Sequence, residues 1–270
     1  MTPHKTFLST ILNHENLIVG SALFLLALLA WISMAWFAGQ MQAPAPGISD
    51  MPGMDMGAMT PVFAPWSAAH VFFIFAMWSV MMVGMMTPSA SPMILIYGQV
   101  ARQAQTLGRT FAPPGWFALG YLFSWTLFAA AATAAQYGFE RAALLTPMLA
   151  TANKFVSGGV FIAAGLYQWT PLKDSCLTQC RAPLAFVQRH GGFQPTPLGS
   201  LRLGARHGVY CVGCCGALMA LLFVAGVMNL LWIAGLMIFV LLEKLAPGGR
   251  LLGRVAGIVA VAWGIWILAV

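Results

Sequence analysis

Residues 208–228 read GVYCVGCCGALMALLFVAGVM, a stretch without a single charged side chain. The hydrocarbon core of a bilayer is about 30 Å thick, and a helix of roughly 20 apolar residues crosses it. The stretch therefore predicts a transmembrane helix. Its first half also carries three of the five cysteines of the chain, so a membrane helix and a group of thiols are expected in the same place.

The rest of the chain has the same apolar character. Of its 270 residues, 60% are hydrophobic and 7% are charged, whereas a soluble domain has about 25% charged residues. We expect an all-α fold, a polytopic bundle of about seven transmembrane helices that forms one membrane domain over residues 1–270. The apolar stretches are 17–38, 66–86, 113–135, 154–170, 208–228, 230–245 and 252–270.

Two of these segments need comment. The first, LIVGSALFLLALLAWISMAWFA, is longer than the apolar region of a signal peptide, so we expect it to be retained as a helix. The fifth and sixth are almost continuous. Val227–Leu230 is then a tight turn at one membrane face or a break within one longer element, with Asn229 as a helix cap.

The basic residues separate by side of the membrane. With seven crossings, eleven Lys and Arg fall on one side and two, Arg141 and Lys154, on the other. Cytoplasmic loops carry the excess of Lys and Arg, so the asymmetry predicts a cytoplasmic N-terminus, an extracytoplasmic C-terminus and a multi-pass protein of the cell inner membrane. The net charge of +7 is then explained by the excess of Lys and Arg on the cytoplasmic side. The expected partner is the lipid bilayer and not nucleic acid.

Two loops and two prolines stand out in this arrangement. Residues 39–65 form a Met- and Pro-rich extracytoplasmic loop, where Pro and Gly argue against helix. Residues 171–206 form a cytoplasmic loop that contains Cys176 and Cys180. Pro88 and Pro92 interrupt the second segment and predict a broken helix beside a site or cavity.

All five cysteines fall on the cytoplasmic side by this topology. The cytosol is reducing, so metal ligation or redox chemistry is expected before structural disulfides. Thiolates are soft ligands that suit Cu(I), Zn(II) or iron–sulfur clusters, although membrane cysteines also serve as small apolar fillers. The candidate inner ligands, spaced by about one helical turn within each group, are Cys176, Cys180, Cys211, Cys214, Cys215 and His207.

Methionines give a second signal. There are 17 of them, and several recur every four residues in the second segment, with others on the adjacent ridge. Such a row is typical of helix packing, but thioethers also bind soft Cu(I) where thiolates cannot form. The candidate thioether ligands are Met77, Met81, Met85 and Met86 in the membrane and Met51, Met54, Met56 and Met59 in the outer loop.

Few other polar residues fall near the membrane. Glu243 and Lys244 end the sixth segment, either as a functional intramembrane pair or as an ion pair that reaches the interface. His70 opens the second segment on the outer side, as a structural residue or an imidazole ligand.

Several longer motifs occur in order between about residues 66 and 247. They are AMWSVMMVGMMTP (76–88), YQWTPLK (167–173), CLTQCRAP (176–183), HGVYCVGCC (207–215), GVMNLLW (226–232) and EK (243–244). On these motifs the chain resembles a bacterial family of predicted metal-binding integral membrane proteins, polytopic inner-membrane proteins with a domain of unknown function. That family often has Trp after the paired cysteines, where this chain has Gly216. The resemblance implies metal binding and names no reaction.

The leading hypothesis is an inner-membrane protein that binds a soft transition metal, Cu(I) or alternatively Zn(II), for transport, transfer or homeostasis. A metallochaperone or another membrane protein would be its partner. The alternatives are a membrane thiol–disulfide oxidoreductase that uses the same cysteines, and a structural or assembly subunit of a membrane complex. The chain has no nucleotide-binding loop, nucleophile elbow or HExxH motif, so a binding protein is favoured over an enzyme.

Overall fold

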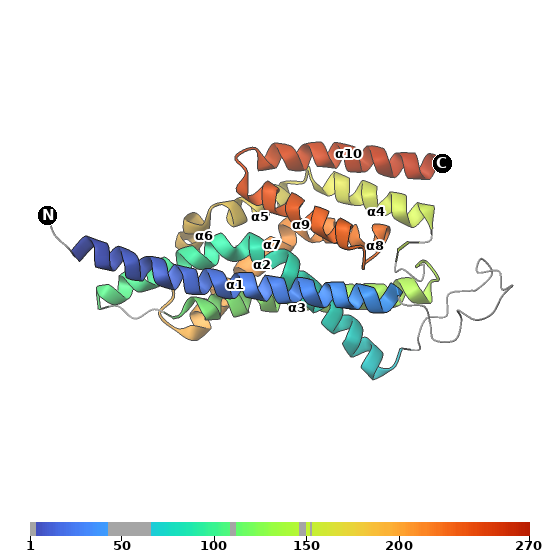
Figure 1. The fold of residues 1–270 in the computed structure, drawn as a ribbon. Coiled ribbons are helices and arrows are strands. Elements are labelled where there is room, and N and C mark those ends of the chain that lie inside the picture. Colours follow the sequence, from blue (N-terminus) through green and yellow to red (C-terminus); the bar gives the residue numbers. More distant parts are fainter. Residues whose placement is uncertain (1–3, 43–65, 109–111, 146–149, 152) are drawn as a thin grey trace.

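The computed structural model describes residues 4–42, 66–108, 112–145, 150–151 and 153–270. This part of the chain is helical and contains no β-strand (Figure 1), which confirms the all-α class for the described residues. The helices are α1 (His4–Gln42), α2 (Ala68–Thr106), α3 (Pro114–Arg141), α4 (Lys154–Tyr167), α5 (Pro171–Arg181), α6 (Pro183–Arg189), α7 (Pro197–Met219), α8 (Leu222–Ala225), α9 (Leu230–Leu245) and α10 (Gly249–Ala269).

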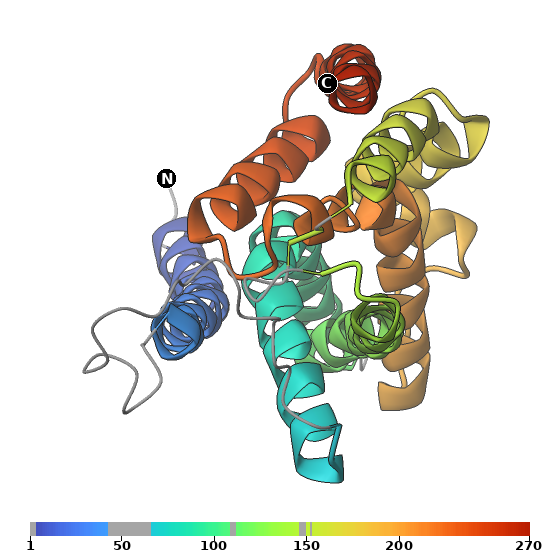
Figure 2. The same cartoon turned by 90° about the vertical axis from the view of Figure 1, so that its right-hand side faces the viewer.

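The longer helices run back and forth along one axis. α1, α2, α3, α4, α7, α9 and α10 alternate in direction, so α1 begins at one end of the molecule and α10 ends at the other (Figure 1). Viewed along that axis, the later part of α2 lies inside the bundle, whereas its first turns project outward and α1 and α10 lie at the edge (Figure 2).

Among the described residues, five helical stretches are long and apolar enough to cross a bilayer. They are Leu17–Gly39, Ala68–Thr106, Pro114–Arg141, Pro197–Ala225 and Gly249–Ala269. The remaining two expected segments are shorter: α4 has 14 residues and α9 has 16. At 1.5 Å per residue they reach about 21 and 24 Å. Large apolar side chains such as Phe24 and Leu251 are two-thirds exposed on the outer helices, which is compatible with lipid contact.

The prediction that Pro88 and Pro92 break the second segment is wrong. α2 continues through both to Thr106 and changes direction on the way (Figure 1). A proline removes one backbone donor and leaves the carbonyl four residues earlier without its partner. The Ser91 hydroxyl donates to the Pro88 carbonyl at 2.8 Å, and the Thr87 hydroxyl donates to Val83 O at 2.6 Å. The Ser91 hydroxyl thus supplies the partner that Pro92 removes from the Pro88 carbonyl, which helps the helix to tolerate this proline.

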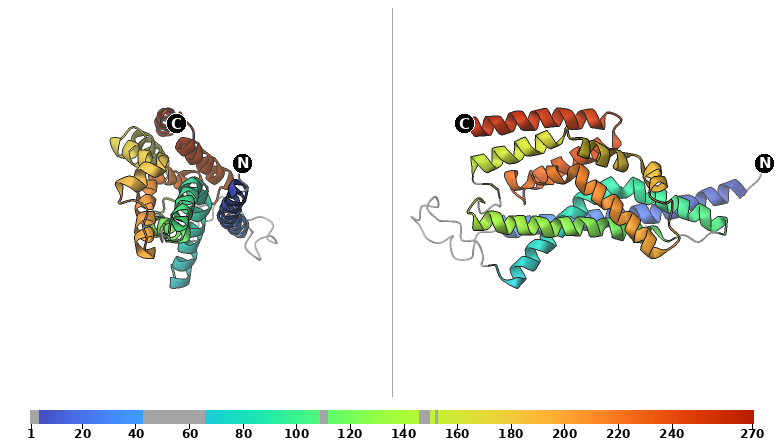
Figure 3. Two further views of the ribbon diagram at one scale, coloured as in Figure 1. Left: turned by 90° about the vertical axis from the view of Figure 1, so that its left-hand side faces the viewer. Right: turned by 180° about the vertical axis from the view of Figure 1, so that it is seen from behind.

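Much of the expected loop at 171–206 is also helical. Thr170 and Thr196 cap α5 and α7 by accepting hydrogen bonds from the backbone N–H of Lys173 and Gly199, and a proline follows each cap. Cap and proline together favour a helix start. α7 therefore begins at Pro197 rather than at residue 208. α6 and the first turns of α7 lie toward the end of the molecule where α1 begins (Figure 3, right).

A turn separates the fifth and sixth apolar segments, which are almost continuous in the sequence. α8 ends at Ala225, Gly226 adopts a φ of 94°, and α9 starts at Leu230. The Asn229 side chain accepts a hydrogen bond from Trp232 N at 3.2 Å. The prediction that Asn229 caps a helix is confirmed.

Glycines bring α3 and α7 into close contact. A Cβ on Gly120 would collide with the backbone of Leu201, and a Cβ on Gly204 would collide with the carbonyl of Phe117. Small residues allow helix backbones to approach in this way. Because the same helix carries the cysteines two turns further on, this crossing fixes the position of the thiols.

Candidate metal centre

Three thiols lie on consecutive turns of α7. Cys211, Cys214 and Cys215 are each no more than 1% exposed. The thiols of Cys214 and Cys215 donate to the Cys211 carbonyl at 3.1 and 2.9 Å. These intrahelical bonds orient the sulfur atoms toward the interior of the bundle and away from lipid.

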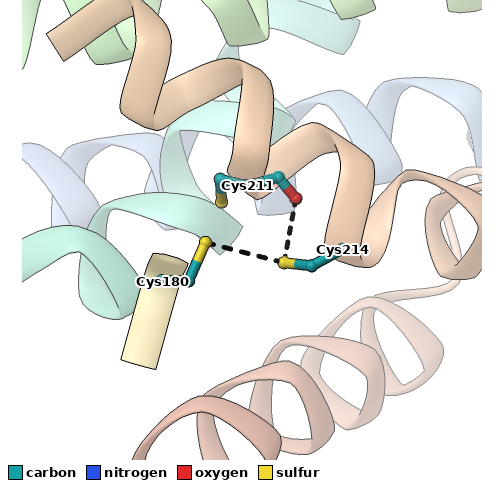
Figure 4. Close-up of side chains that lie close together, drawn as sticks. All are labelled: Cys180, Cys211 and Cys214. Atoms are coloured by element: carbon teal, nitrogen blue, oxygen red, sulfur yellow. Dashed lines mark hydrogen bonds between the residues drawn. The ribbon is translucent and has the colours of Figure 1, made fainter. Parts of the chain in front are cut away.

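The short helix α5 supplies a fourth thiol from the other cysteine group. Cys180 Sγ lies 3.8 Å from Cys214 Sγ, and the sulfur atoms of Cys180, Cys211 and Cys214 all lie within 4.8 Å of one another (Figure 4). Cys180 is half-buried, whereas the other two are buried. Three soft donors from two separate elements thus converge, and we call them the three-thiol cluster.

A glycine allows α5 to approach α7. A Cβ at Gly213 would lie 2.6 Å from Cys176 Sγ, so a larger residue would push α5 away from the cysteine helix. The Tyr167 hydroxyl donates to the Gly213 carbonyl at 2.5 Å and ties the end of α4 to the same point.

Cys176, Cys215 and His207 lie beside the three-thiol cluster without belonging to it. Cys176 packs on Gly213, and Cys215 Sγ is 3.9 Å from Met86 Sδ. The His207 ring packs against the aromatic rings of α3 and α6, and its buried Nδ1 has no hydrogen-bond partner among the described residues.

A buried lysine contacts the cluster. Lys244 Nζ lies 2.9 Å from Cys211 Sγ and 3.1 Å from Ser89 Oγ. The Tyr121 hydroxyl is 3.1 Å from the same sulfur. A cation at this distance stabilises negative charge on the sulfur, and a low-dielectric interior strengthens the effect. The sequence pointed to Lys244 only together with Glu243, as a functional intramembrane pair or an interfacial ion pair, and not as a partner of a cysteine.

Glu243 pairs with a different lysine. Its carboxylate lies 2.6 Å from Lys173 Nζ, and both side chains are at most 2% exposed. Lys173 also donates to Gln168 Oε1, and the Arg181 guanidinium donates to the Glu243 carbonyl at 2.5 Å. An interfacial Glu243–Lys244 ion pair is therefore wrong, because two adjacent helical residues point in different directions. Neither Lys173 nor Arg181 was singled out from the sequence.

The thiols on α5 are held in the neutral form. Hydrogen bonds with Cys211 and Cys214, together with burial, raise the pKa of the Cys180 thiol well above its ordinary value. Burial and the neighbouring Cys214 raise the pKa of Cys176. A metal ion that binds these sulfurs must displace their protons.

The methionines of α2 form a buried row. Met77, Met81, Met85 and Met86 are each at most 1% exposed, and Met86 adjoins the cysteines through Cys215. Met51, Met54, Met56 and Met59 lie outside the described residues. His70 contacts the Trp66 ring at 5.3 Å and is not part of the three-thiol cluster.

A comparison of the chain with known protein families identifies the family to which it belongs. The family PpoB2, described as a copper chaperone, matches residues 75–267, which is well over half of the 270 residues.

The chain belongs to the PpoB2 copper chaperone family.

All five cysteines and the methionine row of α2 fall within the PpoB2 match, whereas α1 and the segment 39–65 precede it. Membership of a copper chaperone family agrees with the metal-related family that the sequence motifs indicated. Searches of curated proteins and of solved structures found no match.

Proposed function

We propose that this protein is an inner-membrane PpoB2 protein that binds one Cu(I) at Cys180, Cys211 and Cys214 and passes it to an acceptor. The observation that carries the proposal is the convergence of three sulfur atoms within 4.8 Å, contributed by two separate helices. The copper chaperone family supports the choice of metal.

The spacing of the sulfurs suits a three-coordinate ion. With metal–sulfur bonds of about 2.3 Å, three sulfurs in one plane with the metal stand about 4 Å apart. The Cys180–Cys214 separation of 3.8 Å agrees with this value. A structural Zn(II) site takes four ligands, whereas the cluster offers three sulfurs, and thiolates are also suited to Cu(I). The three-thiol cluster therefore favours copper over zinc.

Lys244 compensates part of the charge at the site. Three thiolates and one Cu(I) leave two net negative charges, and burying uncompensated charge is costly. Lys244 supplies one positive charge 2.9 Å from Cys211 Sγ. One negative charge then remains with Cu(I) and none with a divalent ion, so the choice of copper rests on the number of sulfur ligands and on the family, not on charge.

The half-buried position of Cys180 suggests where the metal enters. We propose that a soluble donor delivers Cu(I) to Cys180 on α5, and that the ion then reaches the buried pair on α7. Cys215 and Met86, 3.9 Å apart, are the next donors on our proposed route. Met77, Met81 and Met85 continue it along α2, and Met51, Met54, Met56 and Met59 would exchange metal outside. Cys176 and His207 are proposed accessory donors.

Copper content of the purified protein tests this function. The experiment compares wild type with the triple variant Cys180→Ser, Cys211→Ser, Cys214→Ser, each loaded with Cu(I) under reducing conditions. The matched control is Ser175→Ala, because Ser175 is exposed on the same short helix and lies outside the cluster. We expect about one copper in wild type and control and none in the triple variant.

Equal, sub-stoichiometric copper in all three proteins would contradict the proposal. The 3.8 Å separation of Cys180 and Cys214 also favours one alternative, thiol–disulfide exchange, because a small rotation would bring these sulfurs to bonding distance. A wild type that binds no copper, combined with a Cys214→Ala variant that traps a mixed disulfide with a partner, would establish that alternative.

A further inference from the structure

A pocket of about 470 Å³ opens where α6 ends and α7 begins. It lies away from the three-thiol cluster and shares no residue with it. No acidic side chain lines the pocket. Its main lining residues are His190, Gln194, Arg202, Leu203, Arg206 and Val209.

Two arginines give the pocket its charge. Arg202 and Arg206 stand four residues apart on α7, so they project from the same face. Both are exposed, and neither makes an ion pair or hydrogen bond with another described residue. Two other arginines of the bundle are engaged: Arg254 pairs with Asp174, and Arg250 donates to Thr178. Two adjacent guanidinium groups without partners are a site for an anion.

The opposite wall is polar and ordered. His190 Nδ1 lies 2.8 Å from the Phe186 carbonyl, which can only accept, so Nδ1 carries the proton. His190 Nε2 lies 3.5 Å from the Tyr210 hydroxyl. These contacts keep the ring in place, so the pocket is shaped before any ligand enters.

The depth of the arginines matches a lipid headgroup. The uncharged part of α7 begins at His207, so Arg206 and Arg202 lie about 1.5 and 8 Å outside it at 1.5 Å per residue. The headgroup layer on each side of the hydrocarbon core is about 5–8 Å thick. Val209 is 64% exposed and lies on the same side of α7, one turn further into the apolar region. The arginines thus lie at the depth of a phospholipid headgroup, and the exposed Val209 lies at the depth of its acyl chains.

We propose that this pocket binds an anionic phospholipid, with its phosphate on Arg202 and Arg206 and an acyl chain along Val209. Guanidinium groups bind phosphate through two parallel hydrogen bonds. Basic pockets on the cytoplasmic side of membrane helices are suited to such headgroups. The site is independent of copper, and it would anchor the start of the cysteine helix at the membrane surface.

Native mass spectrometry in detergent tests the proposal with phosphatidylglycerol, phosphatidylcholine and inorganic phosphate as separate ligands. The variants are Arg202→Gln/Arg206→Gln and, as a control, Arg189→Gln, an exposed arginine of α6 outside the pocket lining. Wild type and control should bind one phosphatidylglycerol more tightly than phosphatidylcholine. Because each charge-assisted bond contributes about tenfold or more, the double variant should bind at least about tenfold more weakly.

Three outcomes would overturn the assignment. Unchanged phosphatidylglycerol binding in the double variant would show that the arginines serve another partner, such as an acidic protein. Displacement of the lipid by equimolar inorganic phosphate would assign the pocket to a soluble anion. If the double variant fails to fold, Arg202→Lys/Arg206→Lys takes its place. That variant keeps the charge but loses the paired hydrogen bonds, so wild-type affinity in it would also contradict the proposed binding mode.

Discussion

Lys244 is the residue whose surroundings say most about the site. Lys244 is 6% exposed, and its ammonium group contacts Cys211 and Ser89. The preceding residue, Glu243, points toward Lys173 instead. Each buried charge thus has its own partner, because an isolated buried ion is strongly unfavourable. Spacing along the chain cannot show this, since Lys173 and Glu243 are 70 positions apart.

Replacing Lys244 with Met should weaken Cu(I) binding by roughly ten- to a hundredfold, because a hydrogen bond to a charged group contributes about 1.5–3 kcal/mol. Competition with a coloured Cu(I) chelator measures the affinity. Lys244→Arg should retain more of the Cu(I) affinity than Lys244→Met. Lys154→Met serves as the control, because Lys154 is exposed at the start of α4. Equal affinity in Lys244→Met and wild type would remove the lysine from the proposed site.

The pH dependence of copper binding follows from the thiols on α5. Since the pKa of Cys180 is raised, its proton remains bound at neutral pH in the metal-free protein and must leave when copper binds. Copper affinity should therefore rise as pH increases toward that pKa and fall in acid. The same chelator competition at several pH values measures the slope. An affinity independent of pH would mean that Cys180 is not a ligand.

At the scale of helices, α5 and α7 make the site. The sequence analysis placed Cys176 and Cys180 in a loop, whereas the structure places both on α5; the other three cysteines lie on α7, in the stretch expected to be a helix. Their contact depends on features with a weak sequence signal, chiefly the glycine at 213 that accommodates Cys176. The caps at Thr170 and Thr196 could have revealed the helices inside the presumed loop. Each is a threonine followed by proline, which is a helix-start pattern.

The α3–α7 crossing should be sensitive to a single methyl group. Gly204→Ala would force a Cβ against the Phe117 carbonyl, and overpacking of this kind costs about 1–3 kcal/mol. Thermal unfolding in detergent measures the loss. Gly138→Ala on α3 is the control, because nothing lies within 4 Å of its added Cβ. That change should be neutral or stabilise the protein by up to about 1 kcal/mol. Similar losses in both variants would contradict the close crossing.

At the scale of the whole molecule, the alternating helices give the bundle two different ends. Cys176 and Cys180 lie on α5, the other three cysteines lie in the second half of α7, and the basic pocket lies at the start of α7. We propose that this end faces the cytoplasm, since Lys and Arg gather on that side. A reducing compartment would keep the thiols available for a soft metal.

Reporter fusions test this orientation. A fluorescent protein that matures only in the cytoplasm should report from the N-terminus, and a phosphatase active only outside should report from the C-terminus. Exchanging the two reporters provides the control. Both termini on the same side would mean an even number of crossings, and the short helices α4 and α9 would then be the ones to re-examine.

The sequence by itself determined the all-helical class, the positions of most helices and the choice of the cysteines and methionines as candidate donors. These depend on local properties: the length of apolar runs, the spacing of cysteines and the caps that start helices. The convergence of Cys180 with Cys211 and Cys214, the lysine at Cys211 and the Lys173–Glu243 pair were decided only by the tertiary structure. The physical reason is that each joins residues from different helices, and the direction of a side chain toward another helix follows from packing rather than from its neighbours in the chain.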